Sequence, residues 1–135
     1  MTEYKKPTNE EFAAMSDDQK RVAVAKDVLA LLDSRRIVES HGDFLCTPDN
    51  ALEISIGRAQ TESICSVCAR GALVFSAFRF GLAHSEHTGA SREPLHNMGL
   101  NDDDIDLIEH HFEDSEVPIA DIMRSIIKNN GEILE

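Results

Sequence analysis

The sequence has no long hydrophobic run and few basic residues, and each absence excludes a class of protein. Its longest apolar run, residues 28–32, has five members, whereas a membrane-spanning helix needs about 20. Thirteen Lys and Arg stand against 25 Asp and Glu, for a net charge of −12. This balance excludes a protein that holds nucleic-acid phosphates on a basic face. Residues 1–7 contain no apolar core of the signal-peptide kind, so we expect a cytoplasmic protein.

The composition is that of one folded domain. The chain has 135 residues, of which 41% are hydrophobic and 28% charged, which is enough to bury a core and fits a single domain. We expect a flexible N-terminus over residues 1–7 and a single helical domain over residues 8–135. The nucleotide and metalloprotease motifs G-x-x-x-x-G-K-S/T, G-x-G-x-x-G and H-E-x-x-H do not occur.

Capping residues mark the ends of several helices. Thr8 opens a capping box, Ser16 caps a longer helix, and Asn101 precedes a first turn rich in aspartate. A last helix starts at Pro118 and ends at Asn130-Gly131 in a left-handed cap. The apolar face predicted for the helix after Ser16 consists of Val22, Ala25, Val28, Leu29 and Leu32.

Three other segments complete the predicted fold. Segment 61–80 is apolar nearly all round, which predicts a buried central helix. The His41-Gly42 turn between short apolar runs predicts a β-hairpin, and the glycine-containing segment 81–100 predicts a long surface loop. The expected fold class is therefore mainly α: a compact helical domain of four to five helices around a central apolar helix (61–80), with one short β-hairpin (37–46).

The negative charge is concentrated in segment 93–123. This segment holds ten acidic residues and no Lys or Arg, so the rest of the chain carries 15 acids and 13 bases. Such a segment repels nucleic acid and attracts basic partners. The predicted partner-binding residues are Glu93, Asp102, Asp103, Asp104, Asp106, Glu109, Glu113, Asp114 and Glu116. The alternative is that these carboxylates serve only solubility and helix capping.

The cysteines leave three interpretations open. Cys65 and Cys68 form a C-x-x-C pair, and Cys46 is the third cysteine. Together with one of four histidines, they could supply the four ligands of a structural zinc site. A redox pair at a helix start is the second interpretation, and a pair of small buried hydrophobic residues is the third. The candidate histidines are His41, His84, His87 and His96.

Two other patterns suggest chemistry that the surrounding residues do not support. Asp102, Asp104, Asp106 and Glu113 occupy positions 1, 3, 5 and 12 of a calcium-binding EF-hand loop, but position 6 is Leu107 where a glycine is required. We therefore expect a continuous helix there. The histidines of the 81–100 loop have no Ser or Cys nucleophile that could be placed beside them, so no catalytic residues are predicted.

Three segments together resemble a known family. They are Cys65-x-Val67-Cys68-Ala69-x-Gly71-Ala72, Leu107-Ile108-Glu109-x-x-Phe112-Glu113 and Ile122-Met123-x-x-Ile126-Ile127-x-Asn129-Asn130-Gly131. This combination resembles small, uncharacterised phage and prophage helical proteins with a C-x-V-C-A-x-G-A helix. The resemblance implies a viral or prophage setting, with the cytoplasm of the host cell as the location, and transfers no catalytic residues.

From these features we expect a non-enzymatic, acidic interaction protein of phage or prophage type. It would bind and inhibit a host or defence protein that has a basic surface, with the carboxylates acting as mimics of nucleic-acid phosphates. No cofactor, membrane or direct nucleic-acid binding is expected. The alternatives are a zinc-stabilised domain that uses Cys46, Cys65 and Cys68, and a small-molecule pocket between the central helix and the 81–100 loop.

Overall fold

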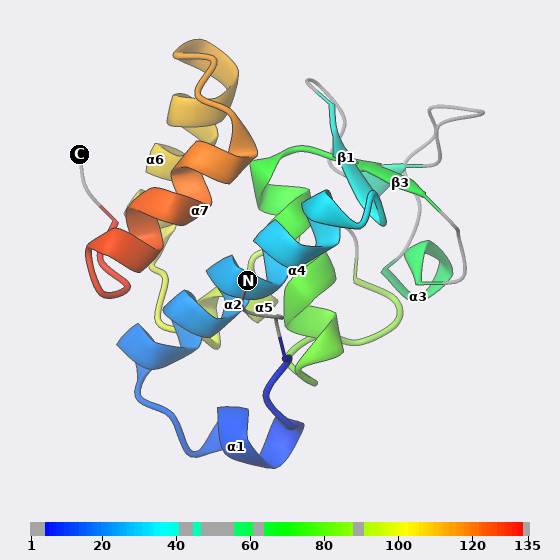
Figure 1. The fold of residues 1–135 in the computed structure, drawn as a ribbon, viewed down its shortest axis with the longest axis vertical. Helices are drawn as coiled ribbons and strands as arrows, with labels where there is room; N and C mark the ends of the chain where they lie inside the picture. The colour runs from blue at the N-terminus through cyan, green and yellow to red at the C-terminus, as the bar shows by residue number, and fades with distance from the viewer. Residues whose placement is uncertain (1–4, 41–44, 47–55, 61–63, 88–90, 134–135) are drawn as a thin grey trace.

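The computed structural model describes residues 5–40, 45–46, 56–60, 64–87 and 91–133. The predicted mainly helical fold is confirmed (Figure 1). The elements are α1 (Asn9–Ala13), α2 (Asp17–Asp33), β1 (Ile37–Glu39), β2 (Leu45–Cys46), α3 (Ile56–Ala59), β3 (Cys65–Val67), α4 (Ala69–Arg79), α5 (Glu93–His96), α6 (Asp102–Glu109), a π-helical turn η1 (His110–Asp114) and α7 (Ile119–Lys128). Within the described ranges, no helix combines the length and apolar character that crossing a bilayer requires.

The predicted caps at Thr8, Ser16 and Asn101 are all present. The Thr8 hydroxyl accepts from the backbone N–H of Glu11 at 3.0 Å, while the Glu11 carboxylate accepts from the Thr8 N–H at 2.9 Å. Ser16 and Asn101 form the same reciprocal capping box with the third residue of their helices. Each box satisfies two backbone N–H groups that the first turn would otherwise leave unpaired.

Helix α4 is the centre of the domain. Its residues from Ala69 to Ala77 are all buried, and it contacts α2, α3, α5 and α6. Helix α7 lies alongside α2 on the outside of this core (Figure 1). The predicted central apolar helix therefore exists, but it begins at Ala69 rather than near residue 61. Residues 61–63 lie outside the described part of the chain.

The start of the predicted central helix is wrong because residues Cys65–Val67 form a strand. Cys65 and Val67 are buried and Ser66 between them is half-buried, which is the two-residue alternation of a strand. Cys68 then caps α4, its Sγ accepting from the Gly71 N–H at 3.4 Å. Apolar residues alternate too briefly here for the sequence to distinguish a strand from a buried helix.

The predicted hairpin over 37–46 is also wrong, although both of its strands exist. β1 and β2 do not pair with each other, because β3 lies between them in the order β1-β3-β2. β1 pairs with β3 in parallel, with Ile37 opposite Cys65, and β2 pairs antiparallel, with Cys46 opposite Ser66. The central strand thereby satisfies its backbone hydrogen bonds on both edges. The turn residues 41–44 lie outside the described ranges.

The predicted surface loop over 81–100 is partly wrong. Helix α5 forms within this segment, and the last residues of the segment enter the core. Leu95, Met98 and Leu100 are buried, with exposed fractions of 0%, 0% and 3%. Their spacing follows no single helical period, because the chain turns at Gly99, where φ is +84°. Residues 88–90 of this loop are not described.

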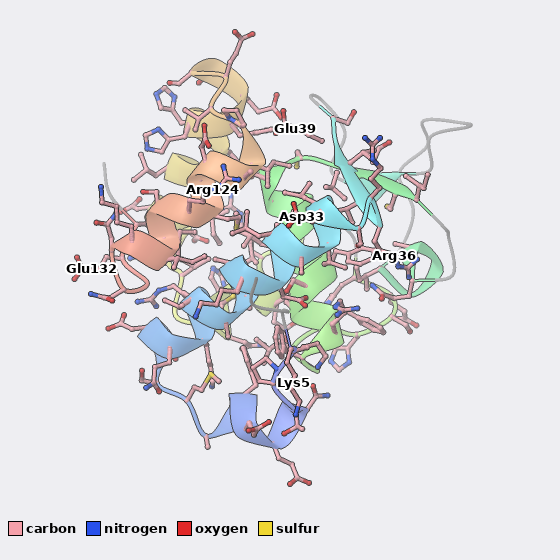
Figure 2. All side chains as sticks on the ribbon, viewed as in Figure 1. Lys5, Asp33, Arg36, Glu39, Arg124 and Glu132 are labelled. Carbon is pink, nitrogen blue, oxygen red and sulfur yellow. The ribbon has the colours of Figure 1, made fainter. Side chains whose placement is uncertain are left out.

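Helix α7 is capped from a distant strand. Pro118 occupies the N-cap position and offers no side-chain acceptor. The Glu39 carboxylate instead accepts from the backbone N–H of Ile119 at 2.7 Å, and Figure 2 shows Glu39 beside the start of α7. A carboxylate is favoured there by the helix dipole. This contact ties β1 to α7 across 80 residues of chain.

Candidate functional site

Most of the acidic residues of segment 93–123 gather on one helical arm, apart from Glu93 in α5 and Asp121 in α7. α6 and η1 run on without a break from Asp102 to Asp114, and the arm's inner side buries Ile105, Ile108 and Phe112. The expectation of a continuous helix in place of an EF-hand loop is therefore confirmed. We call the arm's exposed carboxylates, with the one that follows it, the acidic face: Asp102, Asp103, Asp106, Glu113, Asp114 and Glu116.

One end of the acidic face is engaged by two side chains, Arg92 at the N-cap of α5 and His96 in α5 itself. Arg92 donates to Asp102 at 3.1 Å and to Asp106 at 2.9 Å. The His96 ring nitrogen lies 2.8 Å from Asp102. The hydrogen bond from His96, followed by that from Arg92, lowers the pKa of the Asp102 carboxyl, and the bond to Asp106 leads the causes that raise the pKa of Arg92. These carboxylates hold α5 to α6.

Three other predicted partner-binding residues also have structural partners. Asp104 accepts from the Asn101 N–H at 3.1 Å as part of the cap. Glu109 pairs with the buried Arg70 of α4, and Glu93 of α5 lies 3.5 Å from the ring of His87, which precedes α5 in the chain. These contacts assign Asp104, Glu109 and Glu93 to holding the fold together.

Three carboxylates of the acidic face are more available: Asp103 in the first turn of α6, and Asp114 and Glu116 at the far end of the arm. Among the described residues, Asp103 and Glu116 have no ion-pair partner, and Asp114 pairs only with the exposed His110, at 2.8 Å. Glu113 is exposed on the same turn, but its charge acts on the buried Cys68 thiol, so it is not counted among them. The arm ends in the π-helical turn η1, where the Ser115 N–H donates to the His110 carbonyl at 3.1 Å. Nothing in the sequence signalled this turn.

The cysteine pair is buried and lies in two different elements. Cys65 belongs to β3 and Cys68 caps α4, so the pair does not share one helix face. Desolvation by the surrounding core raises the pKa of the Cys68 thiol to about 11. Among the described residues, no group of three or more His, Cys, Asp or Glu is arranged to hold a metal ion. His41 and the side chain of Cys46 lie outside the described part.

We expect Cys68 to react slowly with alkylating reagents in the folded protein. A thiol with a pKa of about 11 is about one part in a thousand thiolate at pH 8, against about a quarter for an ordinary cysteine of pKa ~8.5. Iodoacetamide labelling followed by peptide mass spectrometry should show at least a ~100-fold slower rate at Cys68 than in urea-unfolded chain. Similar rates in both states would contradict the buried, protonated thiol.

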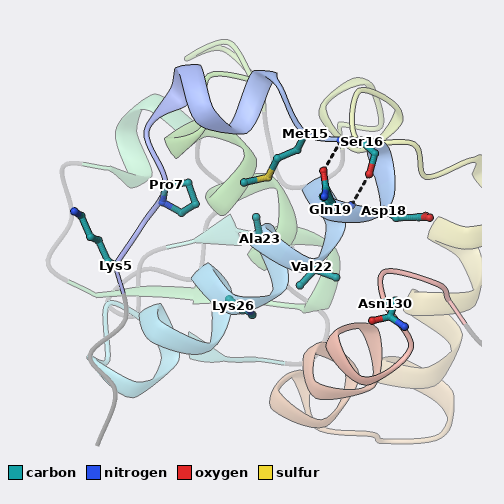
Figure 3. Close-up of a pocket in the computed structure, with 10 residues that line it drawn as sticks. All are labelled: Lys5, Pro7, Met15, Ser16, Asp18, Gln19, Val22, Ala23, Lys26 and Asn130. Atoms are coloured by element: carbon teal, nitrogen blue, oxygen red, sulfur yellow. Dashed lines mark hydrogen bonds between the residues drawn. The ribbon is translucent and has the colours of Figure 1, made fainter.

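A groove that the sequence did not predict lies on α2. It has a volume of about 950 Å³ and is bounded by the extended segment before α1, the α1–α2 corner, α2 itself and the end of α7 (Figure 3). Its lining residues are Lys5, Pro7, Met15, Ser16, Asp18, Gln19, Val22, Ala23, Lys26 and Asn130. The groove lies apart from the segments 61–80 and 81–100, between which a ligand pocket was expected. Val22, which the sequence predicts as a core residue, is only half-buried in the structure because it lines this groove.

Comparison of the chain with family models, with curated proteins and with solved structures finds no match. The resemblance to phage and prophage proteins therefore stays a prediction.

Proposed function

We propose that this protein is an acidic interaction protein of phage or prophage type, which acts in the host cytoplasm by binding a basic surface on a host or defence protein. The observation that carries the proposal is a set of exposed carboxylates on the α6–η1 arm that no ion pair ties to the core within the described ranges. They are Asp103 in the first turn of α6, and Asp114 and Glu116 at the far end of the arm.

The arm suits such a role because it is held in place before any partner binds. Its inner residues Ile105, Ile108 and Phe112 are at most 1% exposed. On its flank, Arg92 ties the first turn to α5 and Arg70 ties Glu109 to α4. A fixed row of charges loses little conformational entropy on binding, so more of the electrostatic attraction appears as affinity.

Fixed carboxylates on a helix can also imitate a phosphate backbone. A basic site that holds nucleic acid by its phosphates would accept the acidic face in their place, and the net charge of −12 speeds the encounter. Inhibition would then follow from competition. The binding charge lies mainly on Asp103, Asp114 and Glu116, because Arg92 already pairs with Asp102 and Asp106.

Neutralising the available carboxylates should weaken partner binding by about ten-fold, the equivalent of ~1.4 kcal/mol. The test variant is Asp103→Asn/Asp114→Asn/Glu116→Gln, which keeps the caps and the Arg92 and Arg70 pairs. The partner is first captured from host lysate by the immobilised protein and then purified, and its Kd is measured by titration calorimetry at low and moderate salt.

The matched control removes three exposed carboxylates elsewhere, as Glu10→Gln/Asp33→Asn/Glu86→Gln, so that both variants have the same net charge. This control should keep the affinity within about two-fold, since long-range attraction is nearly unchanged. Equal losses in both variants would show that net charge, and not the acidic face, governs binding. Competition with duplex DNA for the purified partner tests phosphate mimicry, and simultaneous binding of both would rule it out.

A further inference from the structure

The groove on α2 differs in charge from the rest of the molecule. Of its charged lining residues, Asp18 pairs with Arg21 of the next helical turn. Lys5 and Lys26 are exposed, and neither forms an ion pair with any residue in the described ranges. Within the described part of the chain, the charged lining residues without an ion pair are therefore both positive, in a protein whose net charge is −12.

The floor of the groove is apolar. Pro7, Met15, Val22 and Ala23 line it, and Figure 3 shows the Met15 side chain extending across it toward Pro7. Met15 packs against the core but stays half-buried, and a methionine adapts its shape to different apolar ligands. An apolar floor of this kind favours a ligand with a hydrocarbon body.

Two polar side chains of the groove wall, Ser16 and Gln19, use their oxygen atoms within the protein. The Ser16 hydroxyl accepts from the Gln19 N–H at 3.3 Å, and the Gln19 side-chain oxygen accepts from the Ser16 N–H at 3.0 Å. Because the capping box uses these oxygen atoms, they offer little to a hydrogen-bonding ligand such as a sugar. What the groove presents is an apolar surface with two cations on different walls, Lys5 before α1 and Lys26 on α2 (Figure 3).

We propose that this groove binds a free, medium-chain carboxylic acid. The hydrocarbon chain lies along Pro7, Met15, Val22 and Ala23, and the carboxylate is attracted to Lys5 and Lys26. Charge complementarity selects this class, since the two lysines repel cationic amphiphiles and the apolar floor gives no advantage to small hydrophilic anions. The site is distinct from the acidic face and does not depend on the proposed function.

Decanoate, used below its micelle concentration, tests the proposal. Titration calorimetry should give a saturable, single-site isotherm, and ¹⁵N–¹H spectra should shift at the groove residues of α2 and the segment before α1. From hexanoate through octanoate to decanoate, Kd should fall by about two- to four-fold per methylene, because a fully buried methylene contributes ~0.8 kcal/mol. Acetate and decyltrimethylammonium, which lack the chain and the negative head respectively, should bind at least about ten-fold more weakly than decanoate.

A pair of variants of equal net charge makes the test specific. Lys5→Gln/Lys26→Gln should weaken decanoate binding by about ten-fold, whereas Arg35→Gln/Lys128→Gln, outside the groove lining, should change it by less than about two-fold. Circular dichroism of both variants should match the parent protein, because all four side chains are exposed.

Three results would overturn the proposal. Decyltrimethylammonium binding as tightly as decanoate would reduce the interaction to hydrophobic adsorption. Spectral shifts at the groove that depend on protein concentration, together with dimers in sedimentation velocity, would show that the groove binds a second copy of the chain instead. Lysine-dependent cosedimentation with phosphatidylglycerol vesicles, without binding of free decanoate, would show that the groove binds a membrane surface instead of a free acid.

Discussion

Replacing Arg79 with methionine is expected to lower the free energy of unfolding by about 3 kcal/mol, because the substitution leaves a buried carboxylate without its cation. Asp27 of α2 is 0% exposed. Its carboxylate accepts from Arg79 Nε at 2.9 Å, from Arg79 Nη2 at 3.1 Å and from the Ser76 hydroxyl at 2.8 Å. We place the effect at the low end for buried pairs because 30% of the Arg79 side chain remains exposed.

Urea unfolding of four proteins at neutral pH measures this effect. Arg79→Met should be less stable than Asp27→Leu/Arg79→Met, because the double variant no longer holds a buried charge. Arg124→Met is the control, since its pair with Asp121 is exposed on both sides and should contribute less than about 1 kcal/mol. If Arg79→Met cost no more than Arg124→Met, Asp27 would have to be solvated or protonated in the folded state.

Replacing Gly131 with alanine is expected to cost about 2–4 kcal/mol, from left-handed backbone strain and overpacking together. Gly131 follows the end of α7 with a φ of +94°, and a Cβ there would overlap the backbone carbonyl of Asp18. Arg21 Nε also donates to the Gly131 carbonyl at 2.6 Å. The substitution therefore pushes the end of α7 away from the first turns of α2, with which α7 forms the largest helix contact.

Gly81→Ala is the matched comparison for this prediction. Gly81 follows α4 with a φ of +83°, but the atom nearest to its Cβ would be the flexible Asn9 side chain, at 3.4 Å. It should lose only the backbone strain, about 1–2 kcal/mol. Thermal and urea unfolding of both variants separate the two contributions, and equal losses would show that Asp18 moves aside at little cost.

The local signals in the sequence located the starts of α1, α2 and α6 and the end of α7, but not the start of α4. Thr8, Ser16 and Asn101 cap helices because each interaction joins residues three apart, so the pattern needs no knowledge of the rest of the fold. Asn130 and Gly131 end α7 for the same reason, with φ values of +55° and +94°. Glu39 could not be recognised as the cap of α7, because its partner Ile119 is distant in the chain.

Strand pairing and loop packing were mispredicted for a common reason. β3 separates β1 from β2 only because residues from two distant parts of the chain meet. Leu95, Met98 and Leu100 were assigned to a surface loop because a few apolar residues around a glycine show no periodicity, and only contact with the core buries them. The burial of Asp27 did have a signal in the sequence, because it is a lone acidic residue between Val24 and Val28 on a face of α2 that is otherwise apolar and buried.

The sequence by itself determined the mainly helical fold class, the helix caps and the concentration of negative charge in segment 93–123, because each depends on composition or on neighbours within one or two helical turns. Only the tertiary structure decided which carboxylates are engaged: Asp102 and Asp106 with Arg92, Glu109 with Arg70, and Asp27 with Arg79. It also created the basic-rimmed groove, by bringing Lys5 and Lys26 to walls of one cavity. An ion pair or a groove depends on distances in space, and those are set by how the helices pack.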